Sequence, residues 1–177
     1  MPQVSVYFAS MIKAIKGENG NMGRPDYNPK KHSLMTFHNN LSNFYDGSDT
    51  PRKFLERCLE KINAIEEDVM AWEIINIDAA REAADQAGKR YNERKTLSLV
   101  DGMPIGIKDL IETFDMPTEF GSELFEGHQP IRDAASVNAL RKGGAVILGK
   151  TVTISFGGGD PARPRTPHDP SRTPGGS

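Results

Sequence analysis

Apolar residues first recur at helical spacing in the segment that begins near residue 50. Thr50 suits the N-cap of a helix, and Pro51 suits its first helical position, where a missing N–H costs no hydrogen bond. The residues that then fall on one helical face are Phe54, Leu55, Cys58, Leu59, Ile62 and Ile65. Because free cysteine is often buried, we expect Cys58 to fill the core rather than to act as a nucleophile. The pattern predicts a helix over residues 50–68.

Two further segments have helical character. Residues 78–94 carry an alanine stripe that permits close packing, and Asp78 is predicted to cap this helix. The stripe comprises Ala79, Ala80, Ala83, Ala84 and Ala87. Residues 132–144 predict a helix that starts near Asp133 and stops at Gly143.

Three short apolar runs predict β-strands, at residues 69–76, 102–109 and 145–150. The last two flank the helix predicted over residues 132–144. This order of strand, helix and strand predicts an α/β fold in which the two strands are parallel and joined by a right-handed crossover. We expect part of a mixed sheet flanked by helices.

The two ends of the chain lack this periodicity. Residues 1–34 are rich in glycine, asparagine, proline and charge, and predict a poorly structured leader before a folded unit of residues 35–177. The lysines of the N-terminal apolar run lie within or after it, which is unlike a signal peptide. Residues 157–177 predict a loop.

The segment GGAVILGKT, residues 143–151, formally matches the phosphate-binding pattern G-x-x-x-x-G-K-[ST]. A phosphate loop needs its glycine-rich turn after a strand and before a helix. Here Gly144 follows a predicted helix, and residues 145–148 are the apolar residues of a buried strand. We interpret the match as a helix end followed by a strand, not as a nucleotide site.

Composition narrows the functional classes. The 177 residues include 22 Lys or Arg and 24 Asp or Glu, and this net charge of −2 gives no electrostatic reason to expect nucleic acid or an anionic membrane as a partner. No apolar run approaches the roughly 20 residues that span a bilayer. The single cysteine, Cys58, fits a reducing compartment, so we expect a cytoplasmic protein. The four histidines lack metal-ligand spacing, and neither a metal nor a cofactor is expected.

Several motifs occur together in the order and spacing of one enzyme family. They are DGMPIGIKDLIET, TEFGS, DAASVNALRKGGAVILGKT, SFGGGDP and TPHDPSRTPGGS. From about residue 50 to residue 177 the chain resembles the amidase signature family. Members of that family hydrolyse carboxylic amides, or transfer ammonia from them, with a Ser–cis-Ser–Lys triad.

The resemblance implies catalytic roles for two residues. Lys108, in GIKD, matches the family's catalytic lysine, and Ser177, in PGGS, matches the bridging serine that follows a cis peptide bond. The family's nucleophilic serine lies further downstream, after a glycine-rich run that supplies the oxyanion hole. We therefore expect amide hydrolysis by a longer parent enzyme and no activity from these 177 residues alone.

The chemistry explains why these residue types are needed. A serine must lose its proton as it attacks the unreactive carbonyl of an amide. In the family, an uncharged lysine takes up that proton through the bridging serine, and burial favours the uncharged form of a lysine. Lys108 ends the apolar run MPIGI, which is compatible with burial. Asp109 should point to the opposite face of the strand, away from the pocket of Lys108.

Two alternative functions stay open on the sequence alone. One is a catalytically dead, truncated product that acts only as a binding or interaction module. The other is an amidotransferase-type enzyme component that releases ammonia for tRNA amidation. Asp101, Ser155 and Thr166 depart from residues common in the family, so no branch is assigned. The expected partner is a small-molecule amide, with a homodimer possible for the longer parent.

Overall fold

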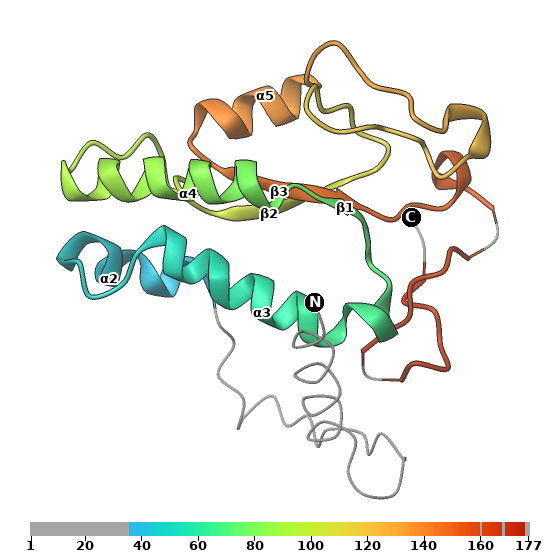
Figure 1. Ribbon diagram of the computed structural model, residues 1–177, viewed down its shortest axis with the longest axis horizontal. Helices are drawn as coiled ribbons and strands as arrows, with labels where there is room; N and C mark the ends of the chain where they lie inside the picture. Colours follow the sequence, from blue (N-terminus) through green and yellow to red (C-terminus); the bar gives the residue numbers. More distant parts are fainter. Residues whose placement is uncertain (1–35, 160, 168, 176–177) are drawn as a thin grey trace, which may run out of the picture. The chain divides into compact units, whose positions relative to one another are not determined.

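A computed structural model describes residues 36–159, 161–167 and 169–175. The predicted leader, residues 1–34, lies outside these ranges. The elements in chain order are η1 (His38–Asn40), α2 (Leu41–Asp46), α3 (Pro51–Val69), β1 (Trp72–Ile75), α4 (Ile77–Asn92), β2 (Pro104–Lys108), η2 (Glu123–Phe125), α5 (Ala135–Lys142), β3 (Val146–Thr151) and η3 (Ser155–Gly157) (Figure 1). This arrangement confirms the predicted α/β class.

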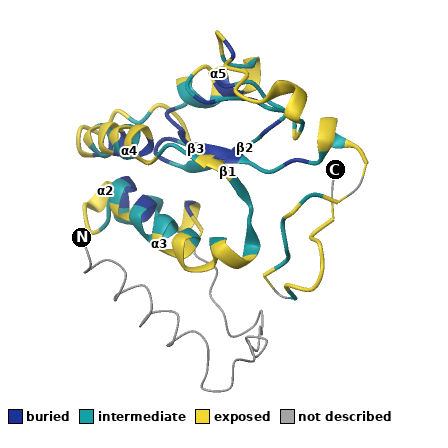
Figure 2. Ribbon diagram, turned by 45° about the vertical axis from the view of Figure 1, so that its right-hand side comes forward, coloured by how far each residue is buried: buried dark blue, intermediate teal, exposed yellow. Residues whose placement is uncertain are grey.

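The strands form one mixed sheet in the order β1, β3, β2. β3 pairs parallel with β2, as predicted, and antiparallel with β1. Parallel neighbours need a crossover connection, and α5 lies in the segment that joins β2 to β3. The central position of β3 explains its continuous apolar sequence, because five of its six residues are buried (Figure 2).

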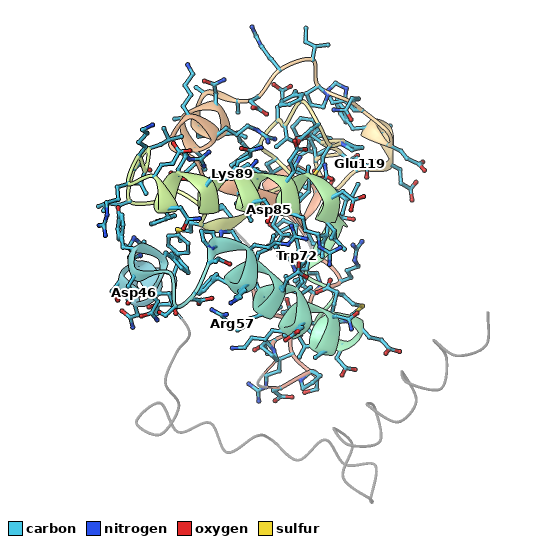
Figure 3. All side chains as sticks on the ribbon, turned by 60° about the vertical axis from the view of Figure 1, so that its left-hand side comes forward. Asp46, Arg57, Trp72, Asp85, Lys89 and Glu119 are labelled. Carbon is cyan, nitrogen blue, oxygen red and sulfur yellow. The ribbon has the colours of Figure 1, made fainter. Side chains whose placement is uncertain are left out.

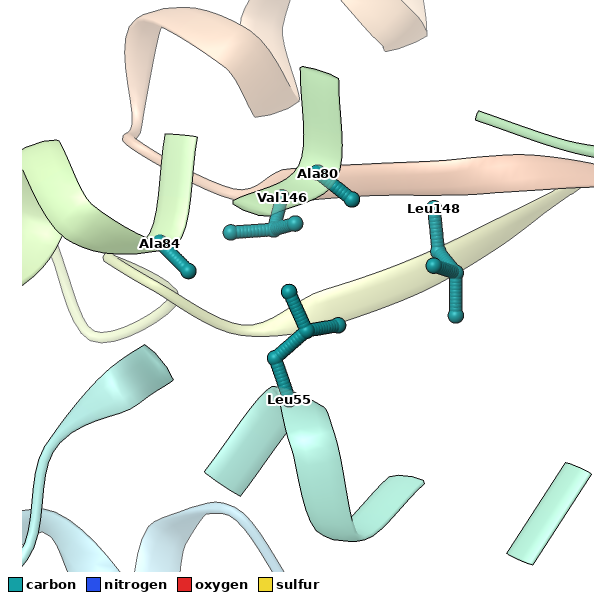
Figure 4. Packing of buried hydrophobic residues seen from close by; sticks show 5 residues of the cluster. All are labelled: Leu55, Ala80, Ala84, Val146 and Leu148. Atoms are coloured by element: carbon teal, nitrogen blue, oxygen red, sulfur yellow. The ribbon is translucent and has the colours of Figure 1, made fainter. Parts of the chain in front are cut away.

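α3 and α4 pack against one face of the sheet. Their core contains Leu55 from α3, Ala80 and Ala84 from α4, and Val146 and Leu148 from β3 (Figure 4). The short alanine side chains let α4 approach the strand closely. Ala87 is also fully buried, whereas Ala79 is exposed, so the predicted stripe is confirmed only along its inner edge.

α5 and the connection at residues 109–134 cover the opposite face, and Figure 1 shows α5 above the sheet and α3 below it. The buried cluster on this side comprises Ile107, Met116, Val137 and Ile147. Arg141 of α5 fastens the connection through ion pairs with Asp115 at 2.6 Å and Asp133 at 3.0 Å.

A β-bulge determines the face of the sheet toward which the side chains at the end of β3 point. The pairing of β2 with β3 skips one residue, Leu148, between the partners of Ile105 and Gly106. A slip of one residue moves the following side chains to the other face of a sheet. Strict alternation would place Lys150 on the same side as Leu148. Beyond the bulge, Lys150 lies instead on the α5 side, beside Asp109.

α3 begins as predicted, because the Thr50 side chain accepts a hydrogen bond from the Lys53 N–H at 3.1 Å. Leu55 is fully buried, but Ile65 is 46% exposed and does not pack on the core, which corrects the predicted apolar face. Cys58 packs against an aromatic cluster of Phe37, Phe44, Phe54 and Tyr91. Burial raises the pKa of its thiol, as suits a core residue.

The starts of two other helices differ from the prediction. Asn76, not Asp78, is the N-cap of α4, and its side chain accepts from the N–H three residues on at 3.3 Å. Asp78 lies in the first turn, where a carboxylate complements the helix dipole. α5 is preceded by Ala134, while Asp133 accepts from the Phe114 N–H at 3.0 Å and so fixes the preceding connection.

Candidate active site

Lys108 is the last residue of β2 and borders a cleft of about 350 Å³. The cleft is lined by Ala71, Lys108, residues 151–154, Ala162, Pro164, Pro174 and Gly175. Lys108 is half-buried and is the one ionisable side chain among the described residues of this lining. Asp109 turns to the α5 side of the sheet, as alternation predicts, and does not line the cleft.

Hydrogen bonds to the edge strand β1 and to the residue before it hold the chain beside the cleft. Arg163 donates to the Trp72 carbonyl at 3.1 Å and pairs with the Glu73 carboxylate at 2.9 Å. The Val152 N–H donates to the Ala71 carbonyl at 2.9 Å. The segment that follows β3 is thereby tied to the edge of the sheet, beside the side chain of Lys108.

Trp72 packs over two glycines on the Lys108 side of the sheet; Figure 3 labels this tryptophan. A Cβ atom at Gly106 would lie 2.9 Å from both the Trp72 ring and the Thr151 methyl group. A Cβ atom at Gly149 would lie 3.1 Å from the same ring. Because Thr151 is the register partner of Lys108, these glycines make room for a large aromatic ring next to the cleft.

Ser177, the second predicted catalytic residue, lies outside the described residues. Its role and the peptide bond before it therefore stay predictions, as does the role of Lys108. Two residues shortly before it, Pro174 and Gly175, line the same cleft as Lys108. The cleft thus brings together the two sequence segments that carry the predicted catalytic residues.

A buried ion pair lies on the α5 side of the sheet. Lys150 Nζ is 2.9 Å from Asp109 Oδ1, and the two side chains are 0% and 2% exposed. The ammonium also donates to Thr118 Oγ1 at 2.5 Å and to the Pro117 carbonyl at 3.0 Å. Burial lowers the pKa of Lys150, and the neighbouring Asp109 carboxylate opposes this shift.

A second cleft, of about 480 Å³, opens near this pair and is rich in carboxylates. Its charged lining residues are Glu73, Asp109, Glu119, Glu123, Glu126 and Arg163. Glu119, labelled in Figure 3, is engaged locally because it accepts from the Gly127 N–H at 2.8 Å. In the part of the chain that the structure describes, no three His, Cys, Asp or Glu residues gather in a way that could hold a metal ion.

The family model described as Amidase matches residues 53–177. The chain belongs to the amidase family. The A subunit of glutamyl-tRNA(Gln) amidotransferase from Chloroflexus aurantiacus is 36% identical over 137 residues, which cover 74% of this chain and 28% of that protein. The amidase-family chain thus spans less than a third of the length of this curated relative.

Solved structures agree with the family. One is the inhibitor-bound form of a vestigial protein complex that reveals the evolutionary origins of an s-triazine catabolic enzyme; it is 25% identical with a TM-score of 0.73, over 78% of this chain and 32% of that chain. Another is the peptide amidase of Stenotrophomonas maltophilia, 27% identical with a TM-score of 0.61, over 66% of this chain and 24% of that one. No helix in the described ranges has the length and apolar character to cross a membrane.

Nothing in the motifs of this amidase-family chain predicts that Lys150 pairs with Asp109. Residues 146–151 form a strand, as expected from the interpretation of the phosphate-loop match as a helix end followed by a strand. Lys150 is the one charged residue of this strand. A lysine inside a buried strand needs a buried anion as its partner. The lysine in this apolar run is therefore the feature of the sequence that could have indicated a buried ion pair. The bulge at Leu148 conceals the partner, because strict alternation assigns Lys150 to the wrong face.

Proposed function

We propose that these residues belong to an enzyme that hydrolyses carboxylic amide C–N bonds, with residues 35–177 as the N-terminal part of its catalytic domain. Lys108 is the general base, Ser177 relays a proton to it, and a serine outside the 177 residues is the nucleophile. The shared cleft carries the proposal, because Lys108 borders it together with Gly175, two residues before Ser177.

The proposed reaction divides a difficult hydrolysis into two steps. The nucleophilic serine attacks the amide carbonyl while its proton passes to Ser177 and the proton of Ser177 passes to the amine of Lys108. The lysine returns a proton to the leaving nitrogen as the C–N bond breaks, which leaves an acyl-serine ester and free ammonia or amine. Water then hydrolyses the ester with the same residues as base.

The test is an assay of ammonia release from a panel of linear amides. The protein assayed is the polypeptide encoded by the complete reading frame that contains these residues, beside the 177-residue chain. Lys108→Met is expected to lower kcat by about 10²–10⁴-fold, the range for loss of a general base. Lys95→Met is the matched control, because Lys95 is 75% exposed and paired only with Glu93 on the surface among the described contacts.

The 177-residue chain is expected to release no ammonia, because the proposed nucleophilic serine lies outside it. Wild-type kcat in a folded Lys108→Met enzyme would refute the proposed base. A reading frame that supplies no downstream serine, or a protein that hydrolyses none of the amides, would refute the proposed function as a whole.

The similarity to the tRNA-dependent amidotransferase favours a second candidate function, release of ammonia from glutamine for tRNA amidation. The identity of 36% to the Chloroflexus aurantiacus protein supports it. The two candidates use the same lysine chemistry and differ in the amide. A kcat/KM for glutamine about 100-fold above that for other amides would favour the second candidate, and the reverse order would favour the first.

A further inference from the structure

We propose that Asp109 and Lys150 are positioning residues that hold Lys108 at the cleft from the opposite face of the sheet. The inference rests on the proposed function for the role of Lys108, but the geometry concerns the 177-residue chain itself. Neither side chain lines the Lys108 cleft, so each acts through the backbone and not through contact with the reacting atoms.

Three hydrogen bonds and one ion pair hold Asp109 in place. Its N–H donates to the Thr151 carbonyl at 2.9 Å, and its carbonyl accepts from the Phe120 N–H at 3.1 Å. Its carboxylate accepts from the Glu119 N–H at 3.0 Å through Oδ2 and meets Lys150 Nζ through Oδ1. Because β2 ends at Lys108, these contacts fix the chain direction just where the strand ladder stops.

Lys150 joins Asp109 to the connection on the α5 side. Its bonds to Thr118 Oγ1 and to the Pro117 carbonyl hold residues 117–119 against the same carboxylate. Lys150 itself sits in the central strand, opposite Ile107 of β2. The residue before Lys108 and the residue after it are therefore both held from the α5 side, while Lys108 points the other way.

This arrangement suits a catalytic lysine better than it suits stability. A buried ion pair is weak evidence for stability, because apolar side chains of similar volume often serve as well. A catalytic group, however, must be held within about 0.5 Å of its productive position by its surroundings. Neighbouring side chains of a strand point to opposite faces of the sheet. The Asp109 carboxylate can therefore anchor the backbone from the α5 side without lying beside the amine of Lys108.

The experiment measures the reactivity of Lys108 in the 177-residue chain. Trace acylation with isotopically labelled acetic anhydride, followed by peptide mapping, gives the rate at Lys108 relative to the exposed Lys95. The test variant is Asp109→Leu combined with Lys150→Met, which removes both charges together. The control is Arg141→Met, which breaks the ion pairs that fasten the same connection to α5 without touching residues 108–109.

In the wild-type chain the Lys108/Lys95 ratio is expected to differ from one, because Lys108 is half-buried at the cleft. In the double variant the ratio is expected to move toward one by about threefold or more, as the end of β2 opens locally. In Arg141→Met it should stay at the wild-type value. A purely structural role predicts that the ratio follows stability, so the double variant and Arg141→Met would behave alike at matched free energies of unfolding.

An unchanged ratio in a folded double variant overturns the proposal, as does a wild-type ratio of one or an equal change in Arg141→Met. If the double variant does not fold, Asp109→Asn, which keeps the side-chain shape, is judged by the same criterion. The result is separate from the proposed function. A shifted ratio together with full hydrolysis by Lys108→Met would keep the positioning role and reject the base.

Discussion

Replacing Lys150 by methionine leaves the Asp109 carboxylate buried without its cation. Methionine keeps most of the volume of the lysine stem, so a cavity contributes little to the effect. Breaking a buried pair by removing one partner costs about 3–5 kcal/mol. Asp109 retains the Glu119 N–H at 3.0 Å, which places the expected loss in the free energy of unfolding toward the lower end, about 3–4 kcal/mol.

Adding Asp109→Leu to Lys150→Met removes the stranded charge and is expected to restore at least half of that loss. The assay is urea unfolding at neutral pH, followed by the fluorescence of Trp72, the single tryptophan of the chain. A loss below about 1 kcal/mol in Lys150→Met would refute the reasoning, because that is an ordinary effect of a point substitution. A double variant whose loss equals the sum of the two single losses would refute it too.

Three further predictions concern the packing of buried side chains. Leu55→Ala should lower the free energy of unfolding in urea by about 2–5 kcal/mol. Ile65→Ala, at a site 46% exposed, should lower it by less than about 1 kcal/mol. Equal losses in the two variants would contradict the packing of α3. Burial raises the pKa of Tyr91 from 10.0 to about 12. The stability that the uncharged Tyr91 contributes is therefore complete below pH 10 and is lost as pH rises to about 12. The difference in free energy of unfolding between wild type and Tyr91→Phe should shrink across that window. A constant difference would contradict this. Gly106→Ala should cost about 1–3 kcal/mol and shift the emission maximum of Trp72, and unchanged emission would contradict the close packing of the ring.

The elements with strong local signals could be predicted from the sequence. Thr50 and Pro51 mark the start of α3. The apolar run of β3 indicates a buried strand without reference to the strands beside it. The cap of α4 could not be predicted as reliably, because Asn76 and Asp78 are both good capping residues and lie two positions apart.

The position of Lys108 in the fold could be predicted from a contiguous motif, whereas the ion pair between Asp109 and Lys150 could not be predicted. The motif GIKD marks Lys108 as a candidate, and its place at the end of a short strand follows from the apolar run before it. Its catalytic role stays a proposal. The pairing of Asp109 with Lys150 depends on the bulge at Leu148, which exists only in the register between β2 and β3. Periodicity within one strand carries no information about that register.

The central claim, that Lys108 is the base of an amide hydrolysis, is tested most directly by chemical rescue. In the polypeptide encoded by the complete reading frame, Lys108→Ala removes the amine and leaves space for a small one. Added methylamine should restore kcat in proportion to the concentration of its free base, with little change in KM, and should leave wild type and Lys95→Ala unaffected. Wild-type kcat in Lys108→Ala without added amine would contradict the account.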